Sequence, residues 1–221
     1  MNRDDLNKAL IESRMRWIES ALVTDLQPVH PIAATGYLAA SFGAIFLCVV
    51  ALTVYRVGPF ALEVMSPLQA GGILGAVTIA IALLAHSLSN QMVPGSLHPI
   101  PPGIVPLAMT ISLAVAIVVL FPFQHERDFW AKSWPCIRAG APIGLVSAVL
   151  SWFVLRRGAV LSPSTTGLGT GLFAGLAGTT VLEFHCTILD AGHILVSHLG
   201  MALLCAMAGL AFGWAAETAR R

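Results

Sequence analysis

The first part of the chain, residues 3–26, repeats apolar and polar positions with the period of an α-helix. At about 100° per residue, apolar side chains form one stripe, and Asp5, Glu12, Arg16 and Glu19 occupy the opposite face. The stripe consists of Leu10, Ile11, Met15, Ile18 and Leu22. Pro28 and Pro31 end the helix, because proline lacks a backbone donor and restricts the residue before it. The pattern predicts one amphipathic helix.

Long apolar stretches follow the two prolines. There are six, at residues 32–55, 68–90, 103–122, 138–155, 164–183 and 192–216. A helix needs about 20 residues to cross a hydrocarbon core of about 30 Å. A backbone inside lipid must satisfy its own hydrogen bonds, and the period-2 alternation of strands is absent, so these stretches are expected to be helices. The pattern predicts six transmembrane helices.

Composition agrees with a membrane protein. Hydrophobic residues make up 57% of the 221 residues and charged residues only 10%, whereas a soluble domain carries about 25% charged residues. The formal net charge of +1 offers no general attraction for nucleic acid, so no direct nucleic-acid binding is expected. The lipid bilayer is therefore the first expected partner.

The distribution of lysine and arginine predicts the orientation. With the N-terminus in the cytoplasm, the inner segments hold eight basic residues and the outer segments hold four. We therefore expect an all-α polytopic membrane protein with a short cytoplasmic N-terminal amphipathic helix. Residues 1–31 would form that cytoplasmic segment, residues 32–216 the transmembrane domain, and residues 217–221 a cytoplasmic tail.

Glycines at four-residue spacing suggest close helix packing. Gly171 and Gly175 form a GxxxG pattern in the fifth stretch, and Gly71 and Gly75 form another in the second. Small residues at this spacing let two helices approach closely. We expect both pairs to pack inside the molecule, and a homodimer contact remains the alternative.

Two of the four cysteines are expected at the outer surface. Cys136 falls in the outer loop 123–137 and Cys186 in the outer loop 184–191, whereas Cys48 and Cys205 fall inside spans. Outer thiols can oxidise to a disulfide or take up soft metal ions. Three interpretations stay open: a plain stabilising disulfide, a thiol pair that senses oxidants or thiophilic metals, and unpaired inert cysteines.

Further potential metal ligands surround the second outer cysteine. Cys136, His185, Cys186, His193 and His198 are the candidate metal-binding set. Their spacing is irregular: His193 and His198 are five apart, which is about 140° on an α-helix and predicts different faces. Glu183, at the end of the fifth span, is expected to be solvated by the headgroups.

Catalytic and transport patterns are weak. No paired carboxylates lie near one another and no nucleophile has an adjacent base in the sequence. No enzymatic activity and no cofactor are therefore expected. No span carries an aspartate, glutamate, lysine or arginine near its middle, which disfavours an ion-coupled transporter. A thiol–disulfide oxidoreductase is disfavoured because the chain has no CxxC.

The N-terminal helix can be interpreted in two ways. An amphipathic helix that contains Trp17 is typical of segments lying on a membrane surface. Residues 1–30, however, hold five acidic and four basic side chains, so anionic headgroups would attract the helix only weakly. Docking of the apolar stripe into a groove on a soluble partner fits the sequence better.

With these residues considered in order, the chain resembles the NrsF family, membrane-embedded negative regulators of extracytoplasmic-function sigma factors. The resemblance rests on the segment from Leu22 to Pro31 before the first span, on Trp134-Pro135-Cys136, on Arg156-Arg157-Gly158-Ala159, on Pro163 with the glycine-rich fifth span, and on His185-Cys186. Each motif alone is weak, and their order together with the six-span pattern makes the resemblance specific.

The resemblance implies an anti-sigma factor in the bacterial inner membrane. Its cytoplasmic N-terminal segment would hold an extracytoplasmic-function sigma factor, and the outward-facing Cys136 and Cys186 would receive an oxidant or heavy-metal signal. Residues 3–26 would be the sigma-binding segment. A small membrane transporter or channel for a metal ion, with His185, Cys186, His193 and His198 at its mouth, is the alternative function.

Overall fold

The computed structural model describes residues 3–24, 33–96, 100–124 and 128–219. The chain divides into two compact units, Met1–Pro31 and Ile32–Arg221. The first contains α1, Arg3–Thr24, which confirms the predicted helix; positions 25 and 26 lie outside the described residues. The apolar side chains of Leu10, Ile11, Met15 and Ile18 are exposed on α1, and the side chain of Leu22 is outside the described part.

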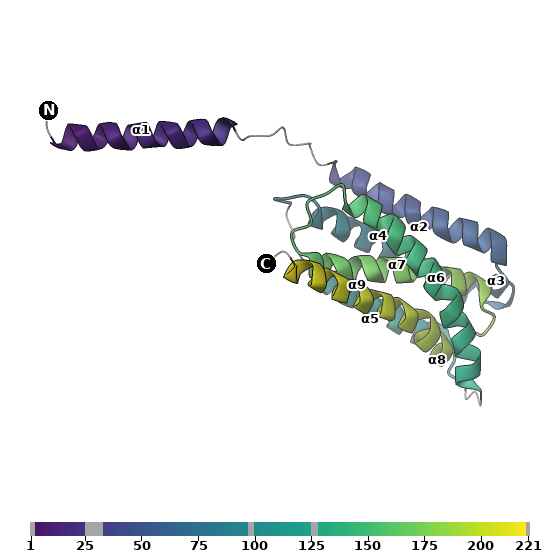
Figure 1. Ribbon diagram of the computed structural model, residues 1–221. Coiled ribbons are helices and arrows are strands. Elements are labelled where there is room, and N and C mark those ends of the chain that lie inside the picture. The colour runs from purple at the N-terminus through teal and green to yellow at the C-terminus, as the bar shows by residue number, and fades with distance from the viewer. Residues whose placement is uncertain (1–2, 25–32, 97–99, 125–127, 220–221) are drawn as a thin grey trace. The chain divides into compact units, whose positions relative to one another are not determined.

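The second unit is a bundle of long helices with three short elements between or within them (Figure 1). The elements are α2 Thr35–Val57, α3 Ala61–Val64, α4 Pro67–Gln91, α5 Ile104–Leu120, α6 Phe129–Leu155, α7 Pro163–His185, α8 Ala191–His193, the π-helix η1 Ile194–Leu199, and α9 Gly200–Thr218. The last three form one continuous helical run. Six long helical segments therefore occupy the positions of the six predicted stretches.

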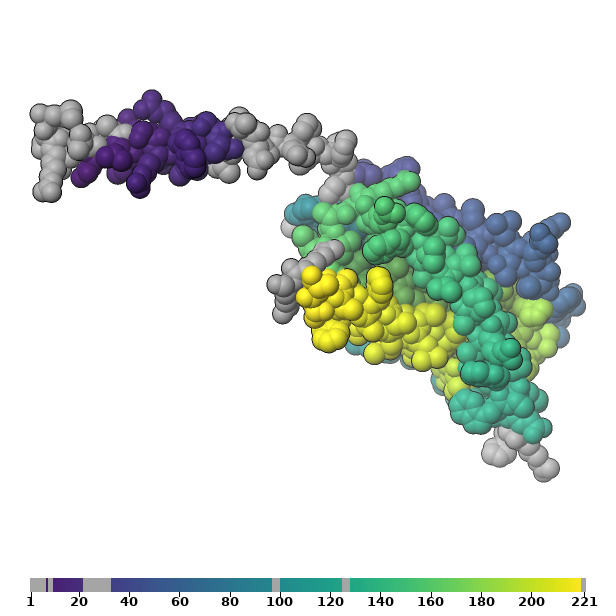
Figure 2. Space-filling view, viewed as in Figure 1, coloured from purple at the N-terminus to yellow at the C-terminus, as the bar shows by residue number. Residues whose placement is uncertain are grey.

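Four of these segments are long and apolar enough to cross a membrane: Thr35–Val57, Pro67–Gln91, Phe129–Leu155 and Ala191–Thr218. Large apolar side chains on their outer faces are exposed, among them Leu52 on α2, Ile79 on α4 and Leu204 on α9. In the space-filling view, α6 and α9 form the face turned towards the viewer (Figure 2). Exposed apolar belts on long helices indicate a membrane protein.

The fourth segment begins earlier than expected. The apolar pattern predicts a start at residue 138, but α6 begins at Phe129 and contains Pro135 and Pro142 in its interior. Its place in the apolar stretch predicts that Pro142 lies near the first turn of the helix. In the structure Pro142 lies in the helix interior instead. Ser133 on the added turns is completely buried, so the part of α6 before the apolar stretch also packs against the bundle.

Helix α7 is the core of the bundle and is buried along most of its length. Its small residues let α9 approach, because a methyl group on Gly167 would overlap the backbone of Gly209, and one on Gly171 would overlap the backbone of Cys205. A methyl group on Gly175 would lie 2.6 Å from the Cα of Ala202. The predicted intramolecular packing of Gly171 and Gly175 is thus confirmed.

The corresponding prediction for α4 is wrong. Gly71 and Gly75 are exposed, and a methyl group added to either would meet nothing within 4 Å. Gly72, one position along, is the glycine that packs inward, because a methyl group there would lie 2.8 Å from Leu120 on α5. Spacing alone identifies a row of small residues on a helix but not the side that faces the bundle.

Candidate functional site

The two cysteines expected at the outer surface lie next to each other. Cys136 is in the second turn of α6, and Cys186 immediately follows α7. Their sulfur atoms are 3.6 Å apart and both thiols are free. Cys186 is in a loop as predicted, whereas Cys136 is in a helix and not in a loop. Cys48 and Cys205 lie within α2 and α9, as expected.

Two histidines complete the cluster because the last long segment begins irregularly. Residues Ile194–Leu199 form a π-helix, in which residues five apart are joined by one hydrogen-bonded turn. The rings of His193 and His198 are 5.4 Å apart at 78°. The prediction that they occupy different faces is therefore wrong, because it assumed α-helical geometry. Thr179 on α7 donates a 2.8 Å hydrogen bond to the carbonyl oxygen of His198.

Four side chains thus present nitrogen or sulfur atoms within 4.8 Å of one another: Cys136, Cys186, His193 and His198. Nε2 of His193 lies 3.5 Å from the sulfur of Cys186. Both histidines are only 1% exposed and Cys186 is 8% exposed, while Cys136 is half-buried. Cys136 is therefore the member through which the cluster reaches the surface.

The fifth candidate ligand, His185, is not in this cluster. Its Nδ1 lies 3.3 Å from the carbonyl oxygen of Gly58, and its ring packs 5.5 Å from that of Phe60. Because His185 is the last residue of α7 and Cys186 the first beyond it, their side chains point in different directions. His185 belongs to the contact with the α2–α3 connection.

Glu183 is part of the site, although its position in the sequence suggests a headgroup-solvated carboxylate. Its side chain is 1% exposed, and its Oε1 lies 2.8 Å from Nδ1 of His198. The headgroup interpretation is therefore wrong. An ionisable residue within an apolar span is by default a functional candidate, and that signal was available in the sequence.

Two further residues, Ser133 and Asp190, hold the site. Ser133 Oγ lies 3.3 Å from Nδ1 of His193. Asp190 caps α8 by accepting a 2.8 Å hydrogen bond from the backbone N–H of His193, and it also accepts one from the backbone N–H of Gln124. The cap is a local pattern, because Asp190 precedes His193 by three residues at the start of a helix. The contacts of Ser133 with His193 and of Asp190 with Gln124 join segments far apart in the chain, which local patterns do not reveal.

The environment of Cys186 keeps its thiol protonated. The hydrogen bond with Cys136, followed by burial, raises the pKa of Cys186 above its ordinary value, and the nearby imidazoles only partly offset this. A two-electron oxidant can convert the two thiols to a disulfide if the sulfur atoms approach from 3.6 Å to about 2.05 Å. A soft metal ion can instead displace both thiol protons without that movement.

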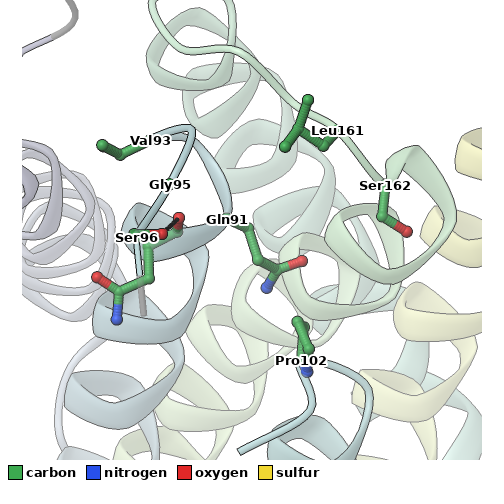
Figure 3. A pocket seen from close by; sticks show the side chains of 8 residues that line it. Gln91, Val93, Gly95, Ser96, Pro102, Leu161 and Ser162 are labelled. Carbon is green, nitrogen blue, oxygen red and sulfur yellow. Dashed lines mark hydrogen bonds between the residues drawn. The ribbon is translucent and has the colours of Figure 1, made fainter. Parts of the chain in front are cut away.

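The structure also has an open pocket formed by the end of α4, the connection between α4 and α5, and the connection that precedes α7 (Figure 3). It is lined by Asn90, Gln91, Val93, Gly95, Ser96, Pro102, Leu161 and Ser162. Thr166 donates a 3.0 Å hydrogen bond to the side-chain oxygen of Gln91, so that amide is already engaged. None of the lining residues is titratable, and the Cys/His cluster therefore holds the reactive chemistry among the described residues.

Comparison with known proteins gives one match. A family model described as "NrsF: Negative regulator of sigma F" matches residues 22–216. The match includes every helix of the second unit and all the residues of the cluster, whereas most of α1 precedes it. No curated protein and no solved structure matches the chain.

Proposed function

The chain belongs to the family of negative regulators of sigma F, and from that membership we propose a membrane anti-sigma factor of the inner membrane with a specific mode of action. Its N-terminal segment sequesters an extracytoplasmic-function sigma factor in the cytoplasm. A chemical change at Cys136 and Cys186, on the other side of the membrane, releases it. The single observation that carries this proposal is the family match over the whole helical bundle.

The proposal assigns six spans to the bundle. Four helices meet the length and hydropathy of a span on their own. Helix α5 is an apolar helix of 17 residues, which at 1.5 Å per residue gives about 26 Å, close to the thickness of a hydrocarbon core. Helix α7 has 23 residues and is enclosed by its neighbours, so it needs little lipid-facing apolar surface. An even number of spans returns the C-terminus to the side of the N-terminus.

The proposed sigma-binding surface is the apolar stripe of α1. Leu10, Ile11, Met15 and Ile18 are between 48% and 64% exposed; Leu22 is the fifth member. Exposed apolar residues at helical spacing are what a groove on a partner recognises. Arg14 lies between Leu10 and Ile11 on the helical wheel, so the stripe has a charge within it that the partner must match. Most of α1 lies outside the family match, which fits a segment adapted to one sigma factor.

Coupling requires that the signal favour one arrangement of the bundle over another. The cysteines suit this role because they lie on different elements that meet at the site: Cys136 is near the start of α6, and Cys186 lies between α7 and α8. A disulfide or a bound ion would fix these elements relative to each other. The family match favours this regulatory role over the alternative of a metal-ion transporter or channel.

The binding part is tested with the full chain in detergent and purified sigma factors of the extracytoplasmic-function class. We expect one of them to be captured, and Ile18→Asp to abolish capture by placing a charge in the apolar stripe. Ser13→Asp is the matched control, because Ser13 is exposed on the opposite side of α1 and introduces the same charge. Equal capture by both variants would exclude the stripe as the docking surface.

The sensing part is tested in cells with a reporter for the sigma-dependent genes. Cys136→Ser with Cys186→Ser should leave insertion into the membrane intact but change the response to oxidants or cadmium. Cys48→Ser with Cys205→Ser removes the same number of thiols and should respond as the wild type. An unchanged stress response in the first double variant would remove the sensor role.

A further inference from the structure

We propose that Cys136, Cys186, His193 and His198 bind one divalent cation of the zinc group, Zn²⁺ or Cd²⁺, with two thiolate and two imidazole ligands. The proposal deepens the sensing part of the proposed function, and only its regulatory consequence rests on that function. The four donor atoms come from α6, the end of α7, α8 and η1, and lie within 4.8 Å of one another.

Two of the distances between the donor atoms match those of a tetrahedral site, and the other donor atoms lie within 4.8 Å of one another. Zinc–sulfur bonds of 2.3 Å and zinc–nitrogen bonds of about 2.05 Å place two sulfurs about 3.8 Å apart, and a sulfur and a nitrogen about 3.6 Å apart. The observed Cys136–Cys186 sulfur separation is 3.6 Å, and Nε2 of His193 lies 3.5 Å from the sulfur of Cys186. The site is thus close to the geometry that the ion requires.

Each imidazole is held through Nδ1, which directs Nε2 to the ion. Nδ1 of His198 pairs with Glu183 at 2.8 Å, and Nδ1 of His193 contacts Ser133 at 3.3 Å. A carboxylate or other acceptor on the far nitrogen is the usual support of a metal-binding histidine. Glu183 and Ser133 are therefore positioning residues in this site.

A buried polar atom without a partner points to a missing ligand. Nε2 of His198 is fully buried and forms no hydrogen bond, and Oε2 of Glu183 on the same pair is also unpaired. Leaving such a group unsatisfied is costly, because it has lost its hydrogen bonds to water and gained none in the protein. A metal ion at the centre of the four donors would satisfy Nε2 of His198 directly. The π-helix supplies the reason that His198 reaches the site at all.

Charge selects a divalent ion. Binding replaces two thiol protons by one M²⁺: two RSH and M²⁺ give M(SR)₂ and two H⁺, and no electron is transferred. The two thiolates neutralise the charge of the ion, and the neutral imidazoles add no charge. The coordinated centre is therefore uncharged, which suits a buried site where a net charge is costly. A monovalent soft ion would leave a net negative centre, and hard ions prefer oxygen ligands.

The test uses the reduced full chain in detergent, first stripped of metal, with Co²⁺ as a spectroscopic probe. We expect one equivalent of Co²⁺ to give the absorption of a tetrahedral site with thiolate charge-transfer bands, and one equivalent of Zn²⁺ or Cd²⁺ to displace it. Failure of the reduced wild type to give a tetrahedral spectrum would overturn the proposal.

Matched variants assign the ligands. His198→Ala and His193→Ala should each weaken binding at least tenfold and change the Co²⁺ spectrum. His185→Ala is the control, because His185 adjoins Cys186 in sequence but contacts Gly58 instead. Glu183→Gln keeps the shape of the side chain and should weaken binding by roughly tenfold, with monodispersity in detergent as the check on folding. Binding by both histidine variants with wild-type affinity and spectrum would overturn the proposal.

Two further measurements separate this proposal from the function proposed above. Metal content after anaerobic purification from membranes distinguishes Zn²⁺ from Cd²⁺ as the ion held without stress. Mass spectrometry of the metal-free protein shows whether Cys136 and Cys186 form a disulfide. A disulfide that reductants do not open would overturn the metal site, because its sulfur atoms could not bind as thiolates. Sigma capture is measured on the same samples. Stoichiometric metal binding without any change in capture would support the site and exclude sensing of that ion. Capture of the sigma factor without metal binding would overturn the site and leave the proposed sigma-factor binding intact.

Discussion

Nδ1 of His198 lies 2.8 Å from Oε1 of Glu183, and both side chains are 1% exposed. The pair joins the end of α7 to the π-helix, across 15 positions of sequence. Removing one partner of a buried pair leaves the other without compensation, whereas removing both together costs less. The two residues are therefore expected to act on stability as a unit.

We expect Glu183→Leu and His198→Leu each to destabilise the protein by about 3–5 kcal/mol. The double variant should lose clearly less than the sum, with a coupling of about 0.5–3 kcal/mol. Denaturant unfolding of the four proteins in detergent measures it. His185→Leu, which has no carboxylate partner, serves as the control for losing an imidazole, and additive losses at Glu183 and His198 would contradict the prediction.

A single methyl group should have opposite effects on two glycines. Gly171→Ala places its Cβ against the backbone of Cys205 on α9, so the helices must separate, at a cost of about 1–3 kcal/mol. Gly71→Ala meets nothing within 4 Å and should stabilise α4 by about 0.5–1 kcal/mol. Melting temperatures in detergent compare the two, and a stabilising Gly171→Ala would show that α7 and α9 are not in close contact.

Asp190 should anchor the segment that carries His193. Its carboxylate accepts hydrogen bonds from the backbone N–H groups of His193 and Gln124 and is buried. Asp190→Ala should cost about 1–2 kcal/mol through the lost cap. It should also speed hydrogen exchange at residues 190–193. Asp190→Asn keeps an acceptor oxygen and should lose less, so equal losses for the two variants would assign the effect to charge instead of capping.

Sidedness gives the fourth prediction. If the N-terminus is cytoplasmic, the half-buried Cys136 faces outward, and an impermeant maleimide should label it in intact cells after reduction. The experiment uses a chain in which the other three cysteines are serine. Ala219→Cys in a cysteine-free chain is the control, since it should react only after the cells are permeabilised. Labelling of Cys136 only from the cytosolic side would invert the proposed path from signal to sigma factor.

The apolar pattern alone located the long helices, except for the first turns of α6. Lipid leaves no partner for an unpaired backbone donor, so a stretch such as residues 68–90 has to become a helix, and it did so as α4. The same local logic predicts α1 from its stripe and its closing prolines. The sequence also singled out Cys136 and Cys186 as the two cysteines expected outside the spans, and their sulfur atoms are 3.6 Å apart.

Which side of each helix faces inward was decided only by tertiary structure. Gly71 and Gly171 share the same spacing motif, yet one faces outward and the other contacts α9, because the contact depends on the neighbouring helix. The change to a π-helix brings His193 beside His198, and no residue type in that segment predicts a π-helix. Hydropathy is a property of each residue and can be read along the sequence. A binding site depends on distances between segments, and those distances are set only when the helices pack.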